Sequence, residues 1–158
     1  MARLSYLDAP DLPEEYRSLM NPQNPHLHGG DSDGSGWDDV EKARNTHRAL
    51  AHNPDILDAY RRFGAAVWQD VGLTSREREL VILSVARALD STYEWHQHVT
   101  IALTEGIPEE HLIALSKMEL SVFDEDERAL IEYTESFVDR SVTDDLHDAL
   151  VEHFDGST

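Results

Sequence analysis

Residues able to move protons lie close together in one short stretch, residues 93–98, which reads Tyr-Glu-Trp-His-Gln-His. Glu94 and His98 are four residues apart, so on a helix they are neighbours on one face. A carboxylate beside an imidazole can fix its tautomer, which suits general acid or base catalysis near neutral pH. A structural role is the alternative, because Ser91 and Glu94 also match a helix capping box.

A second carboxylate, Glu79, lies among leucines on the most apolar segment of the chain. An ionised carboxylate is costly there unless it finds a partner. If this segment packs antiparallel on the next one, Glu79, about three turns before Ser91, comes towards the level of His98, about two turns after it. Glu79, Glu94 and His98 would then form one proton-carrying site. The alternative is that Glu79 is exposed or paired with a nearby arginine, namely Arg76, Arg78 or Arg87.

We assign no metal and no cofactor to this site. Residues two apart on a helix point about 200° apart, so His96 and His98 cannot bind the same ion from one helix. Glu79, Glu94 and His98 are nevertheless ligand types that metals accept, and a metal bound by these three is an open alternative.

The composition excludes several classes of partner. The 158 residues include 32 acidic and 13 basic ones, which gives a net charge of −19. So negative a chain repels nucleic acid and anionic membranes, because binding either requires Lys and Arg to neutralise phosphates. No apolar run reaches the roughly 18 to 20 residues that span a bilayer. We therefore expect neither nucleic acid nor membrane as a partner.

Two further features bear on location and chemistry. The first eleven residues lack the basic and then apolar pattern of a signal peptide, so we expect a cytoplasmic protein. The chain has no cysteine, which rules out disulfides, thiolate metal sites and a thiol nucleophile. The compartment cannot be inferred from that absence.

Helical signals follow one another from residue 37 onward, and no segment alternates as a half-buried strand would. A short helix is expected at 12–20, followed by a Gly- and Pro-rich loop at 21–36. Longer helices are expected at about 38–52, 54–72, 74–90, 91–106, 108–117, 124–140 and 143–154. On the helix at 91–106, the predicted core stripe is Trp95, Val99, Ala102 and Leu103.

These elements predict an all-α, single-domain bundle of about six or seven helices around a central helical hairpin. Residues 1–36 would form an N-terminal short helix and loop, and residues 37–158 the helical domain. The segment at 80–86 is apolar nearly all round, which is typical of a helix at the centre of a bundle or at a subunit contact.

The stretch at 76–115, RERELVILSVARALDSTYEWHQHVTIALTEGIPEEHLIAL, resembles the core of the carboxymuconolactone decarboxylase and alkyl hydroperoxidase D family. The resemblance extends from about residue 45 to 115. In the hydroperoxidase branch, a Glu, a Cys-x-x-Cys motif and a His four residues later build a redox site. Aligning that His with His98 places the two cysteines at Ser91 and Glu94 and the Glu at Glu79. The spacings are kept but both thiols are missing.

The resemblance therefore implies the decarboxylase branch, whose members act on small carboxylated lactones without a cofactor. His98 would be the acid or its relay, Glu94 would orient it, and Glu79 would be a second proton carrier. The predicted substrate-binding residues are Arg87, Ser91 and His96.

Two alternatives stay open: a non-catalytic oligomeric interaction module, and an atypical peroxidase that uses another residue. The family also implies a homotrimer or homohexamer, and we expect a small-molecule substrate.

The acidic composition leads to a hypothesis that can be tested directly. Dense carboxylates favour a protein adapted to high salt, because screening removes the self-repulsion of a chain with a charge of −19. We expect the temperature of thermal unfolding to rise between low and molar salt. An unchanged or lower unfolding temperature in molar salt would refute this halophilic adaptation.

Overall fold

The computed structural model describes residues 4–21, 45–70 and 72–154. The predicted all-α fold is confirmed: these residues form seven α-helices and three short 3-10 helices, and no strand occurs among them. The chain divides into two compact units, Met1–Val71 and Gly72–Thr158. The predicted domain boundary at residues 36 and 37 lies outside the described residues and stays a prediction.

The first unit consists of two 3-10 helices and two α-helices: η1 (Ala9–Asp11), η2 (Glu14–Met20), α1 (Asn45–Leu50) and α2 (Pro54–Asp70). The helix expected at 12–20 is therefore present, but as a 3-10 helix. Of the helix expected at 38–52, only α1 lies within the described residues. The unit closes around a small apolar cluster of Leu12, Leu19, Met20, Ala51 and Leu57.

Helix α2 begins as the sequence predicts. Asn53 lies just before it and accepts a hydrogen bond from the Ile56 amide through its side-chain oxygen, at 3.2 Å. Pro54 occupies the first position, where its missing N–H has no helical partner to lose. Leu57 and Arg61, one turn apart, are both buried, so this face of α2 is the one that packs within the first unit.

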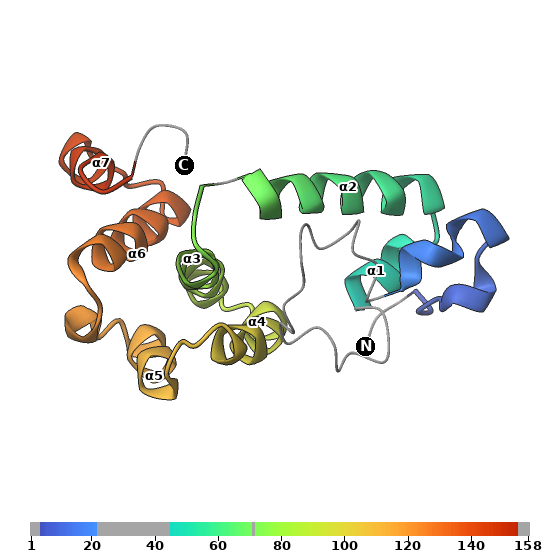
Figure 1. Ribbon diagram of the computed structural model, residues 1–158, viewed down its shortest axis with the longest axis horizontal. Helices are drawn as coiled ribbons and strands as arrows, with labels where there is room; N and C mark the ends of the chain where they lie inside the picture. The colour runs from blue at the N-terminus through green and yellow to red at the C-terminus, as the bar shows by residue number, and fades with distance from the viewer. Residues whose placement is uncertain (1–3, 22–44, 71, 155–158) are drawn as a thin grey trace. The chain divides into compact units, whose positions relative to one another are not determined.

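The second unit contains the remaining helices, with α3 in the middle. Within this unit α3 contacts α4, α5 and α6, and Figure 1 shows it between α4 and α6. The elements are α3 (Ser75–Ala88), α4 (Thr92–Thr104), α5 (Glu109–Lys117), η4 (Leu120–Val122), α6 (Glu125–Val138) and α7 (Asp144–Val151).

Three helices of this unit follow the capping residues Thr74, Asp124 and Thr143, which are the first residues of the helices predicted at 74–90, 124–140 and 143–154. Thr74 and Glu77 form a reciprocal capping box at the start of α3. Asp124 and Glu127 form the corresponding capping box at the start of α6. Thr143 accepts a hydrogen bond from the Leu146 amide at the start of α7. Helix α7 ends at Val151, three residues before the predicted end.

Four consecutive helices of the second unit end in the same way. In each, a residue with positive φ follows the helix, and the next amide bonds back to a carbonyl in the last turn, as in a Schellman motif. At the end of α3, for example, the Ser91 amide bonds to the Ala86 carbonyl at 2.8 Å. The residues with positive φ are Asp90, Met118 and Arg140 after α3, α5 and α6, and Gly106 after α4.

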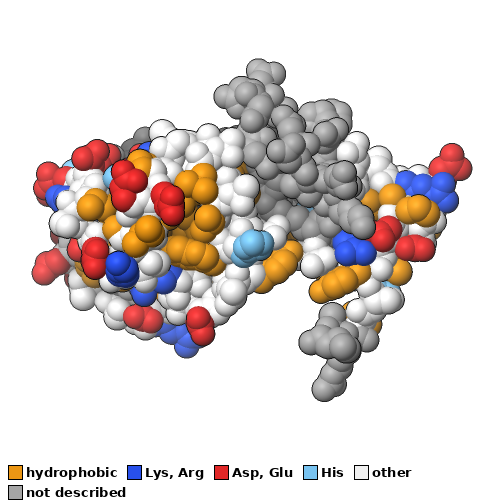
Figure 2. All heavy atoms as spheres, turned by 90° about the horizontal axis from the view of Figure 1, so that it is seen from below, with side chains coloured by type: hydrophobic (Ala, Val, Ile, Leu, Met, Phe, Trp, Pro, Cys, Tyr) orange, Lys and Arg blue, Asp and Glu red, His pale blue; other side chains and the backbone are white. Residues whose placement is uncertain are grey.

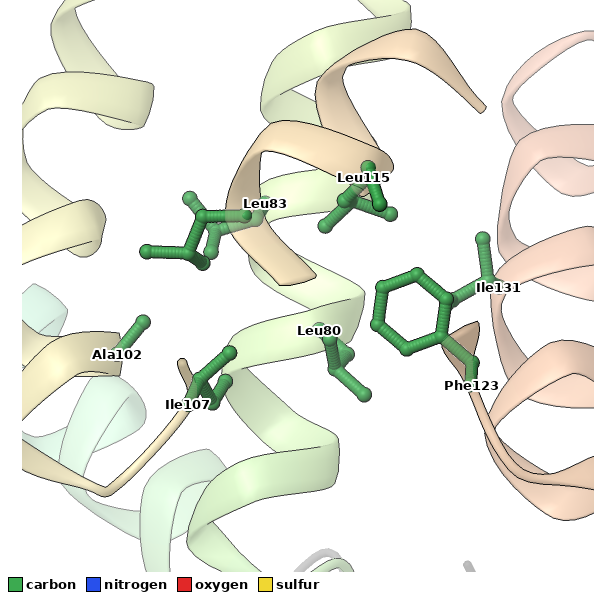
Figure 3. Packing of buried hydrophobic residues seen from close by; sticks show 9 residues of the cluster. Leu80, Leu83, Ala102, Ile107, Leu115, Phe123 and Ile131 are labelled. Atoms are coloured by element: carbon green, nitrogen blue, oxygen red, sulfur yellow. The ribbon is translucent and has the colours of Figure 1, made fainter. Parts of the chain in front are cut away.

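The core of the second unit is formed by apolar side chains from α3, α4, α5 and α6 (Figure 3). Leu80 and Leu83 of α3 are fully buried at its centre. The predicted stripe of α4 is partly wrong, because Leu103 is 47% exposed. The buried face of α4 is instead rotated towards His98 and Ile101, because α3 and its Glu79 pack on that side.

Two Arg–Glu pairs connect α3 to α6. Arg76 donates to Glu127 at 2.5 Å, and Arg87 binds both carboxylate oxygens of Glu135. Glu127 is buried, so its ion pair is shielded from solvent more than a surface pair would be. Both pairs fix the position of α3 against α6, on a different side from the α4 contact.

The surface mixes acidic and apolar side chains. Figure 2 shows one face of the molecule, on which hydrophobic side chains form patches between acidic ones. Among the described residues, no helix has both the length and the apolar character needed to cross a bilayer.

The turn after α3 gives a prediction about stability. Asp90 is exposed and has a φ of 51°, where a Cβ is unfavourable, and its negative charge lies at a helix C-terminus. Replacing Asp90 with Gly removes both costs, so we expect Asp90→Gly to raise the free energy of unfolding by about 1 kcal/mol. Urea unfolding followed by circular dichroism measures this change.

Asp90→Asn is the matched control, because it removes the charge but keeps the Cβ. We expect it to give about half the gain of the Gly variant or less. Destabilisation by Asp90→Gly would contradict the proposed strain at this position.

Candidate active site

The site is carried by the hairpin of α3 and α4. Only three residues separate the two helices, and the Schellman turn at Asp90 reverses the chain between them. The reversal brings Glu79, near the start of α3, opposite His98, in the middle of α4. The predicted antiparallel approach of these two residues is confirmed.

Glu79 and His98 form a buried hydrogen-bonded pair. Nδ1 of His98 lies 2.9 Å from Oε2 of Glu79. The side chain of Glu79 is 0% exposed and that of His98 is 5% exposed. Among the described residues, the other oxygen of Glu79, Oε1, is buried and has no hydrogen-bond partner. A buried carboxyl group with one unused oxygen is unfavourable for folding alone, so it points to a functional role.

Glu94 approaches the opposite nitrogen of the same ring. Its Oε2 lies 3.8 Å from Nε2 of His98, which is within ion-pair range but too long for a hydrogen bond. The Glu94 side chain is 46% exposed, in contrast to Glu79. The imidazole thus lies between one fully buried carboxyl group and one that reaches solvent.

The capping box predicted at Ser91 and Glu94 is wrong. Ser91 makes no side-chain capping hydrogen bond. Its amide, which Glu94 would have to bind in a capping box, donates to the Ala86 carbonyl and closes the end of α3. The Ser91 amide is therefore already hydrogen-bonded within the turn and cannot donate to Glu94. The Glu94 carboxylate therefore does not cap α4, and its Oε2 faces Nε2 of His98.

The contact between Glu79 and His98 requires one shared proton. An imidazole nitrogen and a carboxylate oxygen can bond in two ways: Nδ1–H donates to the carboxylate, or a protonated carboxyl donates to a bare Nδ1. In the second arrangement the neutral ring carries its proton on Nε2, facing Glu94. Moving the proton from Glu79 to Nδ1 while Nε2 loses its own would carry one proton across the ring.

Arg78 is a charged residue near the site that the sequence indicated only as an alternative partner for Glu79. Burial lowers the pKa of Arg78 from its ordinary value, while the charges of Glu79 and Glu105 oppose that effect. A guanidinium nevertheless stays protonated in proteins, so Arg78 places a positive charge at this end of α3. The apolar pattern that indicated a buried Glu79 could not indicate that Arg78 is also partly buried, because adjacent residues on a helix do not share a face.

The predicted substrate-binding residues lie at different places on the hairpin. Arg87 is about 12 Å further along α3 than Glu79, and its guanidinium binds Glu135. Ser91 is partly buried just before α4, and His96 is exposed on α4. Their role stays a prediction.

A metal centre was the open alternative for this site. Among the described residues, no group of three or more His, Asp or Glu side chains is arranged to hold a metal ion.

Two further histidines, His47 and His52, belong to the first unit. There His52 contacts the Ser5 carbonyl at 2.8 Å, and the His47 ring lies edge-on to the Tyr60 ring.

A family model, described as the carboxymuconolactone decarboxylase family, matches residues 54–136. The match covers slightly more than half of the chain and includes Glu79, Glu94 and His98. The chain belongs to the carboxymuconolactone decarboxylase family. No curated protein and no solved structure matches the chain.

Compared with the resemblance expected at 45–115, the match begins later and continues further, from the start of α2 through most of α6. The family assignment therefore covers the hairpin and the helices packed on it. The chain has no cysteine, so it has no thiol at Ser91 or Glu94, the positions where the redox pattern would place one.

Proposed function

We propose that this protein is a cofactor-free lyase or hydrolase that acts on a small lactone carrying a carboxylate. The observation that carries the proposal is the buried Glu79–His98 pair, with the half-exposed Glu94 at the other ring nitrogen. A buried carboxyl group, an imidazole and a solvent-reaching carboxylate in sequence form a path for one proton. Membership of the carboxymuconolactone decarboxylase family supports the substrate class.

In a decarboxylation, the bond between the carboxylate carbon and the ring carbon breaks and CO₂ leaves. The electron pair is delocalised towards the lactone carbonyl, and the carbon must then be protonated. In our proposal, Nε2–H of His98 supplies this proton while the Glu79 carboxyl passes its own to Nδ1. Glu79 ends as a carboxylate and His98 as the other neutral tautomer. Solvent returns the proton through Glu94, which is the exposed member.

The guanidinium of Arg78, next to Glu79 in the chain, offsets part of the repulsion that a chain of charge −19 exerts on an anionic substrate. Arg87, Ser91 and His96 remain the candidates for holding the substrate carboxylate. All three lie near the turn that joins α3 to α4. Because the site uses no thiol, the same arrangement transfers protons and not electrons.

The catalytic proposal predicts which substitutions abolish turnover. Carboxymuconolactone and a panel of related γ-lactone carboxylates are the probes, with CO₂ release as the rate and deuterium uptake from D₂O as the protonation readout. We expect His98→Gln and Glu79→Gln each to lower kcat by about 100-fold or more, and Glu94→Gln by about tenfold, because proton transfer is lost or slowed.

His153→Gln is the matched control, since His153 is exposed and lies just beyond α7, outside the α3–α4 hairpin. The His153 variant should retain most of the activity. Full turnover in both the His98 and Glu79 variants would refute the site, and absence of turnover on every probe would favour the non-catalytic alternative.

We propose further that the protein is a homo-oligomer, a trimer or hexamer, in which α2 contacts a second copy. Four large apolar residues of α2, spaced as in a heptad repeat, are 46% to 70% exposed: Ile56, Tyr60, Phe63 and Val67. Ala59, Gly64 and Ala66 flank this stripe, are exposed, and would allow another helix to approach closely. An added Cβ at Gly64 meets no atom within 4 Å.

Light scattering tests this assembly. We expect the wild-type mass to correspond to a trimer or hexamer, and Phe63→Asp to lower it, because a charge in the stripe prevents helix contact. Ile113→Asp, a substitution of a residue 47% exposed on α5, is the control and should leave the mass unchanged. A monomeric wild type, or an unchanged mass for Phe63→Asp, would contradict the proposal.

A further inference from the structure

A hollow lies in the second unit, away from the Glu79–His98 pair. It is an open groove of about 730 Å³ between the ends of α3 and α6 and the segment that leads to α7. Val85 of α3 and Leu89, the residue just after α3, are about 9 and 15 Å further along the helix axis than Glu79. The groove is therefore separate from the Glu79–His98 pair.

The walls of the groove are apolar except at one point. Leu89 and Phe137 are 63% and 69% exposed, which is unfavourable for side chains of this size in water. The single charged residue is Arg140. The apolar and aromatic lining residues are Val85, Leu89, Tyr133, Phe137, Val138 and Val142.

Arg140 differs from the other arginines of the described residues. Each of the others has a hydrogen-bond, ion-pair or electrostatic partner, for example Glu127 for Arg76 and Glu135 for Arg87. The Arg140 side chain has none among the described residues, although the chain carries 32 acidic residues. Its backbone is held by the Schellman turn after α6, with φ at 56° and its amide bonded to the Phe137 carbonyl at 3.1 Å.

We propose that this groove binds an amphipathic monocarboxylate, a molecule with an apolar chain or ring and one carboxylate. The apolar part would cover Leu89 and Phe137, and the carboxylate would pair with the guanidinium of Arg140. An arginine fork binds a carboxylate through two parallel hydrogen bonds, which a lone alcohol or hydrocarbon cannot use. The volume lies in the range of small-molecule sites.

Binding of sodium octanoate to the full chain, measured by calorimetry, tests the proposal. Acetate and 1-octanol are the matched probes, since each lacks one half of the chemistry, and both should bind more weakly than octanoate. We expect Arg140→Gln to weaken octanoate binding by about tenfold and Arg140→Lys to weaken it less. Phe137→Ala should weaken octanoate and 1-octanol alike.

Lys117→Gln is the control for charge, because Lys117 is exposed on α5 and outside the groove. Circular dichroism confirms that each variant is folded. The proposal would be overturned if octanoate does not bind, if 1-octanol binds as tightly, or if Arg140→Gln and Lys117→Gln have the same effect. A loss of oligomer mass in Phe137→Ala would instead assign the groove to a second copy, which also overturns it.

Discussion

The contact between Glu79 and His98 is the constraint on which the hairpin depends. A carboxyl group with no exposed surface costs several kcal/mol unless another group takes up its hydrogen bond, and His98 is the group that does so. The contact fixes the register of α4 against α3, because a shift by one residue would turn the imidazole away by about 100°. It also explains why His98 and Ile101, and not Leu103, form the buried face of α4.

A buried polar pair of this kind contributes little to stability compared with apolar residues of similar volume. The surrounding core is apolar instead: Leu80, Leu83 and Ile131 are fully buried around the middle of α3. The Arg–Glu pairs at Arg76 and Arg87 hold α3 to α6 from another side. The position of α3 is thus set by these neighbours as well as by Glu79, and the proposed chemical role of Glu79 is compatible with this packing.

The helices of the second unit could largely be predicted, because their limits depend on local chemistry. Thr74 and Thr143 cap helices by accepting hydrogen bonds from amides three residues further on, and the Asp124 amide donates to the Glu127 carboxylate at the start of α6. Gly106 ends α4 because it adopts a positive φ without strain. The capping box predicted at Ser91 does not form, because the Ser91 amide already donates to the Ala86 carbonyl at the end of α3. A capping pattern in the sequence does not show whether a preceding helix uses the same amide.

The site was predictable to the extent that its members follow one another at helical spacing. The Glu94–His98 pair follows from the sequence alone, whereas Glu79 required an assumption about how two helices pack. Arg140 and its groove were not predictable, because the lining comes from α3, α6 and the segment before α7. Whether an apolar residue such as Phe137 is buried depends on neighbours distant in sequence, so its exposure could only be seen in the folded chain.

The position of Glu94 determines what kind of chemistry this hairpin can support. It is the position of the second thiol in the redox pattern that the sequence resembles, and it is the exposed member of the present site. A thiolate there would meet solvent and exchange electrons with an incoming disulfide or peroxide. In our proposal, a carboxylate at the same place exchanges protons with solvent and passes them to Nε2 of His98. The same helical hairpin would then serve proton transfer with Ser91 and Glu94 at the positions where the redox pattern has its two thiols.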